Sequence, residues 1–258
     1  MRLARLKRRS SRRTLLFIAC VATLVGAGTF AAATRLNAQR RFYIEPNAVY
    51  DGRYTFVRLS YTVYGRSGWE FDYPAMERNF MTILKDLTTI KLHSRESNIY
   101  AMDDPELFKH AIAYLSEPGY WHPSPSEAAG LRRWLGKGGF LIVDDFYFRE
   151  WDNFERSMHM VLPSAQLVRL TVKHPIFDSF FQIKTLEGMT HPDNANAKAE
   201  YYGIYENNDP TRRLMVIVNY NNDIGDYMEW SGDGWYPVNM SNDAYKLATN
   251  YIVYAMTH

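Results

Sequence analysis

Gly138-Gly139-Phe140-Leu141-Ile142-Val143-Asp144-Asp145 is the stretch that decides the fold. An apolar run follows two glycines and ends at two carboxylates. A continuous apolar run bounded in this way is typical of a strand that is buried on both faces of a parallel sheet. The carboxylates then fall at the carboxyl end of the strand, where open α/β sheets bind their ligands. The stretch therefore predicts both a central strand and the place of a site.

Segments on both sides of this stretch alternate between strand-like and helix-like patterns. Strands are predicted at residues 54–61, 90–92, 111–115, 166–172 and 214–218, with an edge or antiparallel strand at 201–205. Helices are predicted from Pro74, from Ser124 or Ser126 to Gly136, across 151–161, and from Ser241 or Asn242 to the end of the chain. Residues 225–240 are expected to form a loop. Because strands alternating with helices form a parallel sheet covered on both faces, we expect one three-layer, flavodoxin-like α/β domain across residues 53–258.

The first 38 residues have the pattern of a targeting segment, and residues 39–52 are expected to be a linker. A strongly basic start is followed by an apolar run from Leu15 to Ala33 and then by small residues, which predicts a signal peptide or, alternatively, a membrane anchor. Arg12 and Arg13 resemble the twin-arginine export signal, with the ordinary secretory route as the alternative. The domain is expected to be periplasmic or extracytoplasmic, or anchored in the inner membrane with the domain outside the cytoplasm.

Charge and cysteine content limit the classes of function. Of the 30 basic residues, eight precede Gln39, where no acidic residue occurs, so the remainder has 22 basic against 28 acidic residues, a net charge of −6. A mildly acidic body argues against nucleic acid as a partner, and membrane contact is expected only through the N-terminal segment. The single cysteine, Cys20, lies in the leader, so the body has no disulfide, thiolate metal site or cysteine nucleophile.

Several segments carry a resemblance to a known family: Phe56-Val57-Arg58-Leu59, Asp72-Tyr73-Pro74, Asp104-Pro105-Glu106-Leu107-Phe108, the stretch from Gly138 to Asp145, His174-Pro175-Ile176-Phe177, Asn222-Asp223-Ile224-Gly225-Asp226 and Val253-Tyr254-Ala255-Met256-Thr257-His258. Residues 53–258 resemble an uncharacterised bacterial domain-of-unknown-function family, number 4159. That family looks similar in fold to class I glutamine amidotransferase-like domains. Its biochemical activity is unassigned, so the resemblance implies a fold and no reaction.

The turn after the strand at 111–115 is the expected place of a nucleophile. Ser116 follows this strand, but a nucleophile elbow needs small residues two positions before and after the nucleophile, where this chain has Tyr114 and Pro118. Amidotransferases have cysteine at the elbow, which this body lacks. We therefore expect a non-catalytic or degenerate amidotransferase-like module rather than an enzyme.

The strongest candidates for binding are carboxylates at the ends of predicted strands. Asp144 and Asp145 are adjacent, so their side chains are expected to point to opposite sides, one binding a backbone amide and the other facing the ligand crevice. Asp223 and Asp226 end another buried strand. If the two strands are neighbours, Asp145, Asp223 and Asp226 could converge on a divalent cation, which takes oxygen ligands. Capping and turn formation are the alternative role for these residues.

Histidines and aromatic residues in the loops complete the candidates. His122, His174 and His191 each lie beside a proline and match no zinc spacing; His174 is either a packed loop residue or a general acid or base. Trp69 and Trp121 belong to aromatic loops that either bind a saccharide or protein partner or cover the end of the sheet. The candidate ligand-binding residues are Asp144, Asp145, Glu117, Trp69, Trp121 and His174.

These patterns favour an exported module that binds a protein partner or small ligand. The alternative is a periplasmic hydrolase that uses Asp144 or Asp145 with His174, or a metal held by Asp223 and Asp226. No cofactor is expected beyond a divalent cation.

Overall fold

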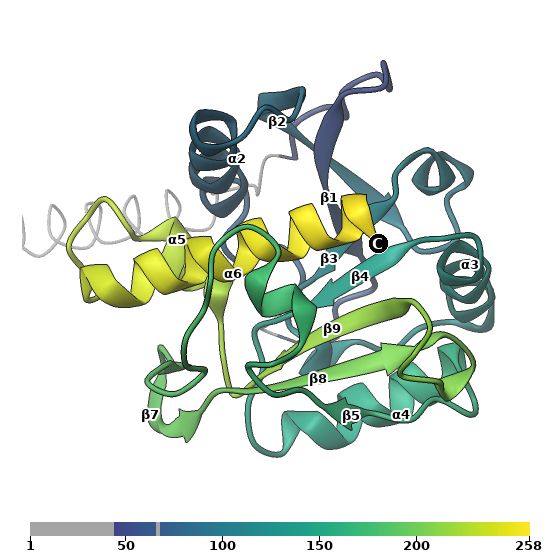
Figure 1. Ribbon diagram of the computed structural model, residues 1–258. Helices are drawn as coiled ribbons and strands as arrows, with labels where there is room; N and C mark the ends of the chain where they lie inside the picture. Colours follow the sequence, from purple (N-terminus) through teal and green to yellow (C-terminus); the bar gives the residue numbers. More distant parts are fainter. Residues whose placement is uncertain (1–43, 66–67) are drawn as a thin grey trace, which may run out of the picture. The chain divides into compact units, whose positions relative to one another are not determined.

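A seven-stranded sheet with the order β2-β1-β3-β4-β9-β8-β5 lies at the centre of the domain (Figure 1). The computed structural model describes residues 44–65 and 68–258. Its elements are β1 (Tyr54–Ser60), α2 (Ala75–Leu87), β2 (Leu92–Ala101), η1 (Pro105–Lys109), β3 (Ile112–Leu115), η2 (Pro118–Tyr120), α3 (Pro125–Gly136), β4 (Phe140–Val143), α4 (Glu150–Val161), β5 (Val168–Arg169), η3 (Pro175–Asp178), β6 (Thr190–His191), β7 (Asn194–Lys198), β8 (Glu200–Tyr205), η4 (Glu206–Asn208), β9 (Leu214–Tyr220), α5 (Ile224–Glu229) and α6 (Val238–Thr257).

Five neighbouring strands of the sheet, from β2 to β9, run parallel, whereas β8 pairs antiparallel with β9 and with β5. The prediction of an α/β fold with a mostly parallel sheet is confirmed, as is an antiparallel strand near residues 201–205. The chain crosses from β2 over β1 to reach β3, so the strand order reverses between β1 and β3. Ligands of open α/β sheets bind beside such a reversal, at the carboxyl ends of the strands.

The opening stretch forms β4 and the turn that leads into it. Gly138 has a φ of +105°, which L side chains rarely adopt, and it directly follows the end of α3. A Cβ on Gly139 would lie 2.4 Å from the Trp134 ring, so only glycine lets the chain pass this side chain. The two glycines therefore allow α3 to turn sharply into the buried central strand.

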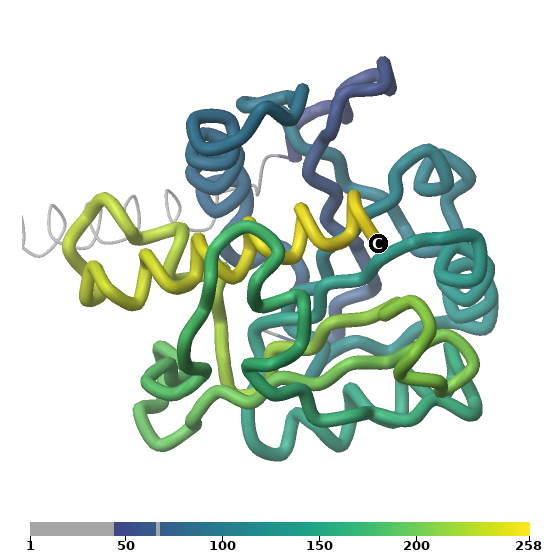
Figure 2. Tube along the Cα trace, viewed as in Figure 1, coloured from purple at the N-terminus to yellow at the C-terminus, as the bar shows by residue number. Residues whose placement is uncertain are grey.

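Helices cover both faces of the sheet. Phe140 and Ile142 pack in a core with α2, α5 and α6, whereas Leu141 and Val143 pack in a second core with α3 and α4. This alternation is the period of two expected when a strand is buried on both sides. Figure 1 shows α6 lying across one face of the sheet. Residues 179–188 run beside α6 (Figure 2), where Asn250 hydrogen-bonds to Phe180 and Phe181.

Some predicted boundaries are wrong. β2 is a ten-residue strand from Leu92 to Ala101 and not a short strand at 90–92. β5 contains only two residues, and the predicted loop at 225–240 begins with helix α5 and ends in the first turn of α6. The short hairpin of β6 and β7 was not predicted. These elements are short or polar, so they lack the apolar periodicity on which the predictions depend.

The predicted leader, including Arg12 and Arg13, lies outside the described residues. Among the residues that the structure describes, no helix has the length and apolar character needed to cross a membrane. The segment predicted as a linker is described from residue 44 onwards, and part of it contacts the sheet. Asn47 and Ala48 hydrogen-bond to residues Ile99 and Asn98 of β2.

Candidate functional site

Three polar residues stand side by side at the carboxyl ends of β3, β4 and β9. Leu115 pairs with Val143, and Val143 pairs with Val218, so the next residue of each strand falls in one row: Ser116, Asp144 and Asn219. All three are fully buried. Strand register alone therefore brings together residues more than a hundred positions apart in the chain.

Asp144 is held by four donors. Its Oδ2 accepts from the Tyr114 hydroxyl at 2.8 Å and from the amides of Ile224 and Gly225, and its Oδ1 accepts from Asn219 Nδ2 at 3.0 Å. Burial and the nearby Asp145 raise the pKa of Asp144 to about 7, and these donors oppose the rise because they favour the ionised carboxylate. Asp144 thereby fixes the start of α5 to the end of β4.

Asp145 faces other partners. Its Oδ2 accepts from the Ser116 hydroxyl at 2.9 Å, and its Oδ1 lies 3.6 Å from His191 Nε2. The residue has a φ of 66°, a left-handed conformation that aspartate tolerates better than most residues. Its amide donates to Asn222 O, which ties the loop after β4 to the loop after β9. The two adjacent aspartates thus bind different parts of the chain.

Helix α5 contributes two further carboxylates. Asp223 caps this helix, because its Oδ1 accepts from the amide of Asp226 at 2.8 Å. Gly225, between them, lets the carboxylates approach: a Cβ at this position would lie 2.7 Å from Asp72 Oδ2 and 3.2 Å from Asp223 Oδ1. The local sequence therefore places two aspartates and a glycine at the start of one short helix.

Asp72 comes from the loop after β1, on the other side of the reversal in strand order. Arg58 of β1 is fully buried, pairs with Glu77 of α2, and donates to the carbonyls of Trp69 and Phe71. These bonds fix the loop immediately before Asp72. Asp72 Oδ2 is buried and has no hydrogen-bond partner among the described residues.

These carboxylates converge in two overlapping groups that share Asp223. Candidate ligand atoms of Asp72, Asp223 and Asp226 lie within 4.8 Å of one another, as do those of Asp145, His191 and Asp223. No lysine or arginine of the described chain forms an ion pair with Asp72, Asp223 or Asp226. Burial, followed by repulsion from Asp145, raises the pKa values of Asp72 and Asp223 well above their usual range. Burial also raises the pKa of Asp226.

His191 is 3% exposed and directs a ring nitrogen into this cluster. Its Nδ1 accepts from the amide of Asp193 at 3.2 Å, so in the neutral ring the proton is on Nε2. This Nε2 is buried and has no hydrogen-bond partner within the described part of the chain. His174, also followed by a proline, makes the same contact with the amide of Ile176. The His-Pro sequence thus has a structural role at both positions.

Several predicted site residues lie outside the cluster. His174 packs against Tyr205 and Tyr254. Tyr205 lies at the amino ends of the parallel strands, whereas Asp145 lies at their carboxyl ends. Trp121 is fully buried in the core beneath α4, where its carbonyl accepts from Asn153 and Ser157.

Two other predicted residues lie on loops that follow the carboxyl ends of β1 and β3. Trp69 is partly buried against the core that contains α3 and α4. Glu117 is partly buried in the turn after β3, where it has a φ of 51° and its carbonyl accepts from the Tyr61 hydroxyl.

Asp72 and His191 were not selected as site residues from the sequence. Asp72 lies 151 positions before Asp223, and only the order of the strands brings the two together. The available signals were the Asp72-Tyr73-Pro74 segment and Gly225, which has no other evident role in so short a helix. His191 offered no spacing to any other ligand.

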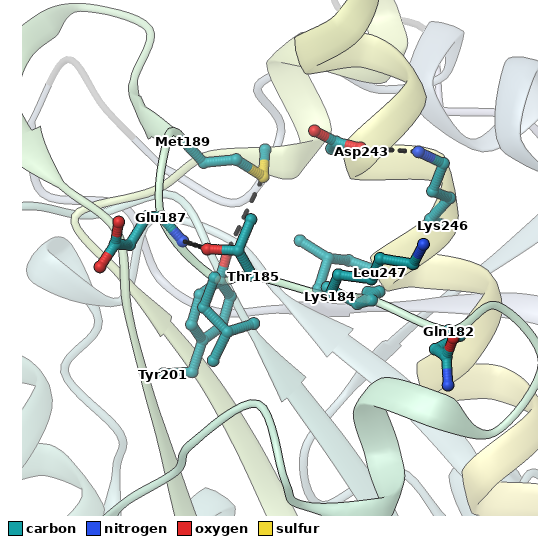
Figure 3. A pocket seen from close by; sticks show the side chains of 11 residues that line it. Gln182, Lys184, Thr185, Glu187, Met189, Tyr201, Asp243, Lys246 and Leu247 are labelled. Atoms are coloured by element: carbon teal, nitrogen blue, oxygen red, sulfur yellow. Dashed lines mark hydrogen bonds and ion pairs between the residues drawn. The ribbon is translucent and has the colours of Figure 1, made fainter.

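A separate hollow of about 340 Å³ lies between residues 182–189 and α6 (Figure 3). Three pairs of its polar groups are bonded to each other: Lys246 with Asp243, the Glu187 amide with the Thr185 hydroxyl, and the Tyr201 hydroxyl with the Met189 sulfur. None of the candidate residues from the sequence lines this hollow. The carboxylate cluster is therefore the better candidate for a functional site.

A family model described as a domain of unknown function, DUF4159, matches residues 55–256. No curated protein matches the chain. The family match confirms the resemblance to domain-of-unknown-function family 4159 and covers every residue of the carboxylate cluster.

Proposed function

The chain belongs to the DUF4159 family, and we propose that it is an extracytoplasmic ligand-binding module whose carboxylate cluster holds a divalent cation. The leader pattern in residues 1–38 supports the location. The fold supports a relationship to flavodoxin-like and amidotransferase-like domains. Counted among themselves, the five parallel strands follow the order 2-1-3-4-5, which is the flavodoxin-like order.

One observation carries the proposal: Asp72, Asp223 and Asp226 direct oxygen atoms to within 4.8 Å of one another, and none of them forms an ion pair with a lysine or arginine of the described residues. Carboxylates this close repel each other, so they either bind protons or bind a cation. Asp72 Oδ2 has no hydrogen-bond partner among the described residues, which is a further sign that a group is to be bound here.

The three aspartates form the better cation site of the two overlapping groups. A histidine ligand needs a free lone pair, and bound histidines donate a proton from the other ring nitrogen. His191 instead accepts a hydrogen bond at Nδ1 from the Asp193 amide, so in the neutral ring its Nε2 carries the hydrogen. An oxygen-only set favours hard cations such as Ca²⁺ or Mg²⁺.

The residues around the cluster support binding rather than catalysis. Ser116 is fully buried and its hydroxyl donates to Asp145, so no surface of this side chain is open to a substrate. The left-handed residue of the turn after β3 is Glu117, which is not a nucleophile of the amidotransferase type. The periplasmic hydrolase remains the alternative. It requires a water activated by the cation, with His191 in place of the distant His174 as the nearby proton donor.

Thermal unfolding of the full chain tests the proposal. A cation at 100 times its Kd stabilises by about 2.7 kcal/mol, and for a domain of about 200 residues each kcal/mol raises Tm by about 2–4 °C. We expect Ca²⁺ or Mg²⁺ to raise Tm by about 5–10 °C relative to EDTA. In Asp72→Asn this increase should disappear, because the change removes one carboxylate ligand. Asparagine also accepts the left-handed backbone of position 72, so the loop should keep its conformation. Asp233→Asn, in an exposed loop, is the control. If no divalent cation changes Tm, the cation site is refuted.

A further inference from the structure

Two tryptophans form an exposed aromatic surface at the end of α5. Trp235 is 72% exposed and Trp230 is 38% exposed. Their ring centroids are 6.0 Å apart and their planes differ by 37°, so the two rings form a tilted aromatic pair. Large aromatic surfaces left in water on a protein often mark binding sites.

This surface is joined directly to the proposed cation site. The Trp230 indole N–H donates to Asp226 Oδ1 at 3.2 Å, and the Tyr236 hydroxyl donates to Asp226 Oδ2 at 2.7 Å. Each carboxylate oxygen accepts in more than one direction, so Asp226 keeps capacity for a cation. Trp230 is therefore bonded to one of the carboxylates that would hold the cation, and Trp235 lies against Trp230.

We propose that the module binds a neutral saccharide, with the sugar ring on the face of Trp235 and two adjacent hydroxyl oxygens on a Ca²⁺ ion held by Asp72, Asp223 and Asp226. This inference rests on the proposed cation site. Ca²⁺ takes six to eight oxygen ligands, so three aspartates leave positions open for hydroxyl groups. Mg²⁺ gives up its water ligands reluctantly and is expected to support sugar binding poorly.

Other ligands with a flat or cationic group fit less well. Asp72, Asp226 and the exposed Asp233 make the surroundings acidic, which disfavours nucleotides with their phosphates. A quaternary ammonium group is bound inside a cage of separate aromatic faces. Here the two neighbouring indole planes differ by only 37°, so the two rings do not form the walls of such a cage.

Tryptophan fluorescence of the full chain tests the inference. The probes are soluble hexaoses of glucose, mannose and N-acetylglucosamine, with adenosine and choline as competing ligand classes, each in CaCl₂, MgCl₂ and EDTA. We expect at least one hexaose to change the fluorescence in CaCl₂. EDTA or the Trp235→Ala change should weaken its binding at least tenfold. Trp235→Ala should keep the Ca²⁺-dependent rise in Tm, because Trp235 bonds to none of the aspartates.

The control is Phe180→Ala, which removes another exposed aromatic side chain, beside α6, and should bind the hexaose as the wild type does. A Ca²⁺-dependent rise in Tm with no response to any hexaose overturns the saccharide inference alone. A response to choline or adenosine instead, or unchanged hexaose binding in Trp235→Ala, also overturns it. If Ca²⁺ has no effect on Tm, the proposed cation site is refuted. If the hexaose binds equally well in EDTA, sugar binding does not depend on the cation, and this part of the inference is refuted.

Discussion

Replacing Asp223 by asparagine removes the one carboxylate that the two groups of the cluster share. Asp223 is 4% exposed, and its Oδ1 accepts from the Asp226 amide at the start of α5. Asparagine caps helices as well as aspartate does. The variant should therefore lose a charge and a cation ligand while α5 still begins at the same residue.

The size of the effect follows from the distances. Two unit charges 4.8 Å apart repel by about 3.5 kcal/mol at an effective dielectric constant of about 20. In the cation-free protein, proton uptake relieves part of this repulsion, because burial raises the pKa of Asp223 well above its usual range. We expect a net stabilisation of roughly 1–2 kcal/mol in EDTA, which is a rise in Tm of about 2–8 °C.

Thermal unfolding of the wild type and Asp223→Asn, each in EDTA and in CaCl₂, measures both effects. The wild type should gain stability from Ca²⁺, whereas Asp223→Asn should be more stable than the wild type in EDTA and gain nothing from Ca²⁺. Asp233→Asn removes the same charge from an exposed loop and should change neither value. A variant that is less stable in EDTA and keeps its response to Ca²⁺ would show that Asp223 only caps α5.

Three further predictions concern the supports of the cluster. Gly225→Ala places a Cβ 2.7 Å from Asp72 Oδ2, so Ca²⁺ binding measured by calorimetry should weaken at least tenfold; unchanged affinity would contradict the close approach. Glu77→Gln leaves the buried Arg58 without its partner and should cost about 3–5 kcal/mol in urea unfolding, and a cost below about 1 kcal/mol would contradict the buried pair. Burial raises the pKa of Asp144 from 3.8 to about 7, so the folded state binds more protons than the unfolded state between these values. The contribution of Asp144 to stability in EDTA should therefore fall as pH rises from about 4 to 7, and an equal pH dependence in the wild type and Asp144→Asn would contradict the raised pKa.

Much of the fold could be predicted because the central strands are short, apolar runs with clear ends. The stretch from Phe140 to Val143 and the strand that begins at Leu214 both show this pattern, and both are buried parallel strands. β2 could not be predicted in full. It contains His93, Arg95 and Glu96, because it lies at the edge of the sheet and buries only some of its side chains.

The candidate site could be predicted only in part, for reasons of distance along the chain. The carboxylates that directly follow β4 and β9 were found from the sequence, because each ends an apolar run. Asp72 follows an irregular loop, and its position depends on the bonds that Arg58 makes to that loop. No local pattern records such contacts. The order of the strands could not be predicted from the sequence. It places β1 beside β3, and this brings the loop after β1 close to the loops after β4 and β9.

Residues with a left-handed backbone cluster at the carboxyl ends of the strands, where the carboxylates also lie. Glu117 after β3, Asp145 after β4 and Asn221 after β9 all have left-handed backbones, with φ values of 51°, 66° and 56°. Such residues cost on the order of 1–3 kcal/mol each and persist only where their surroundings fix them. Here the fixing is mutual, because the Asp145 amide donates to Asn222 O and the Asn221 amide donates to Phe146 O. The loops after β4 and β9 thus hold each other in place, so the proposed cation site would need little rearrangement of these two loops.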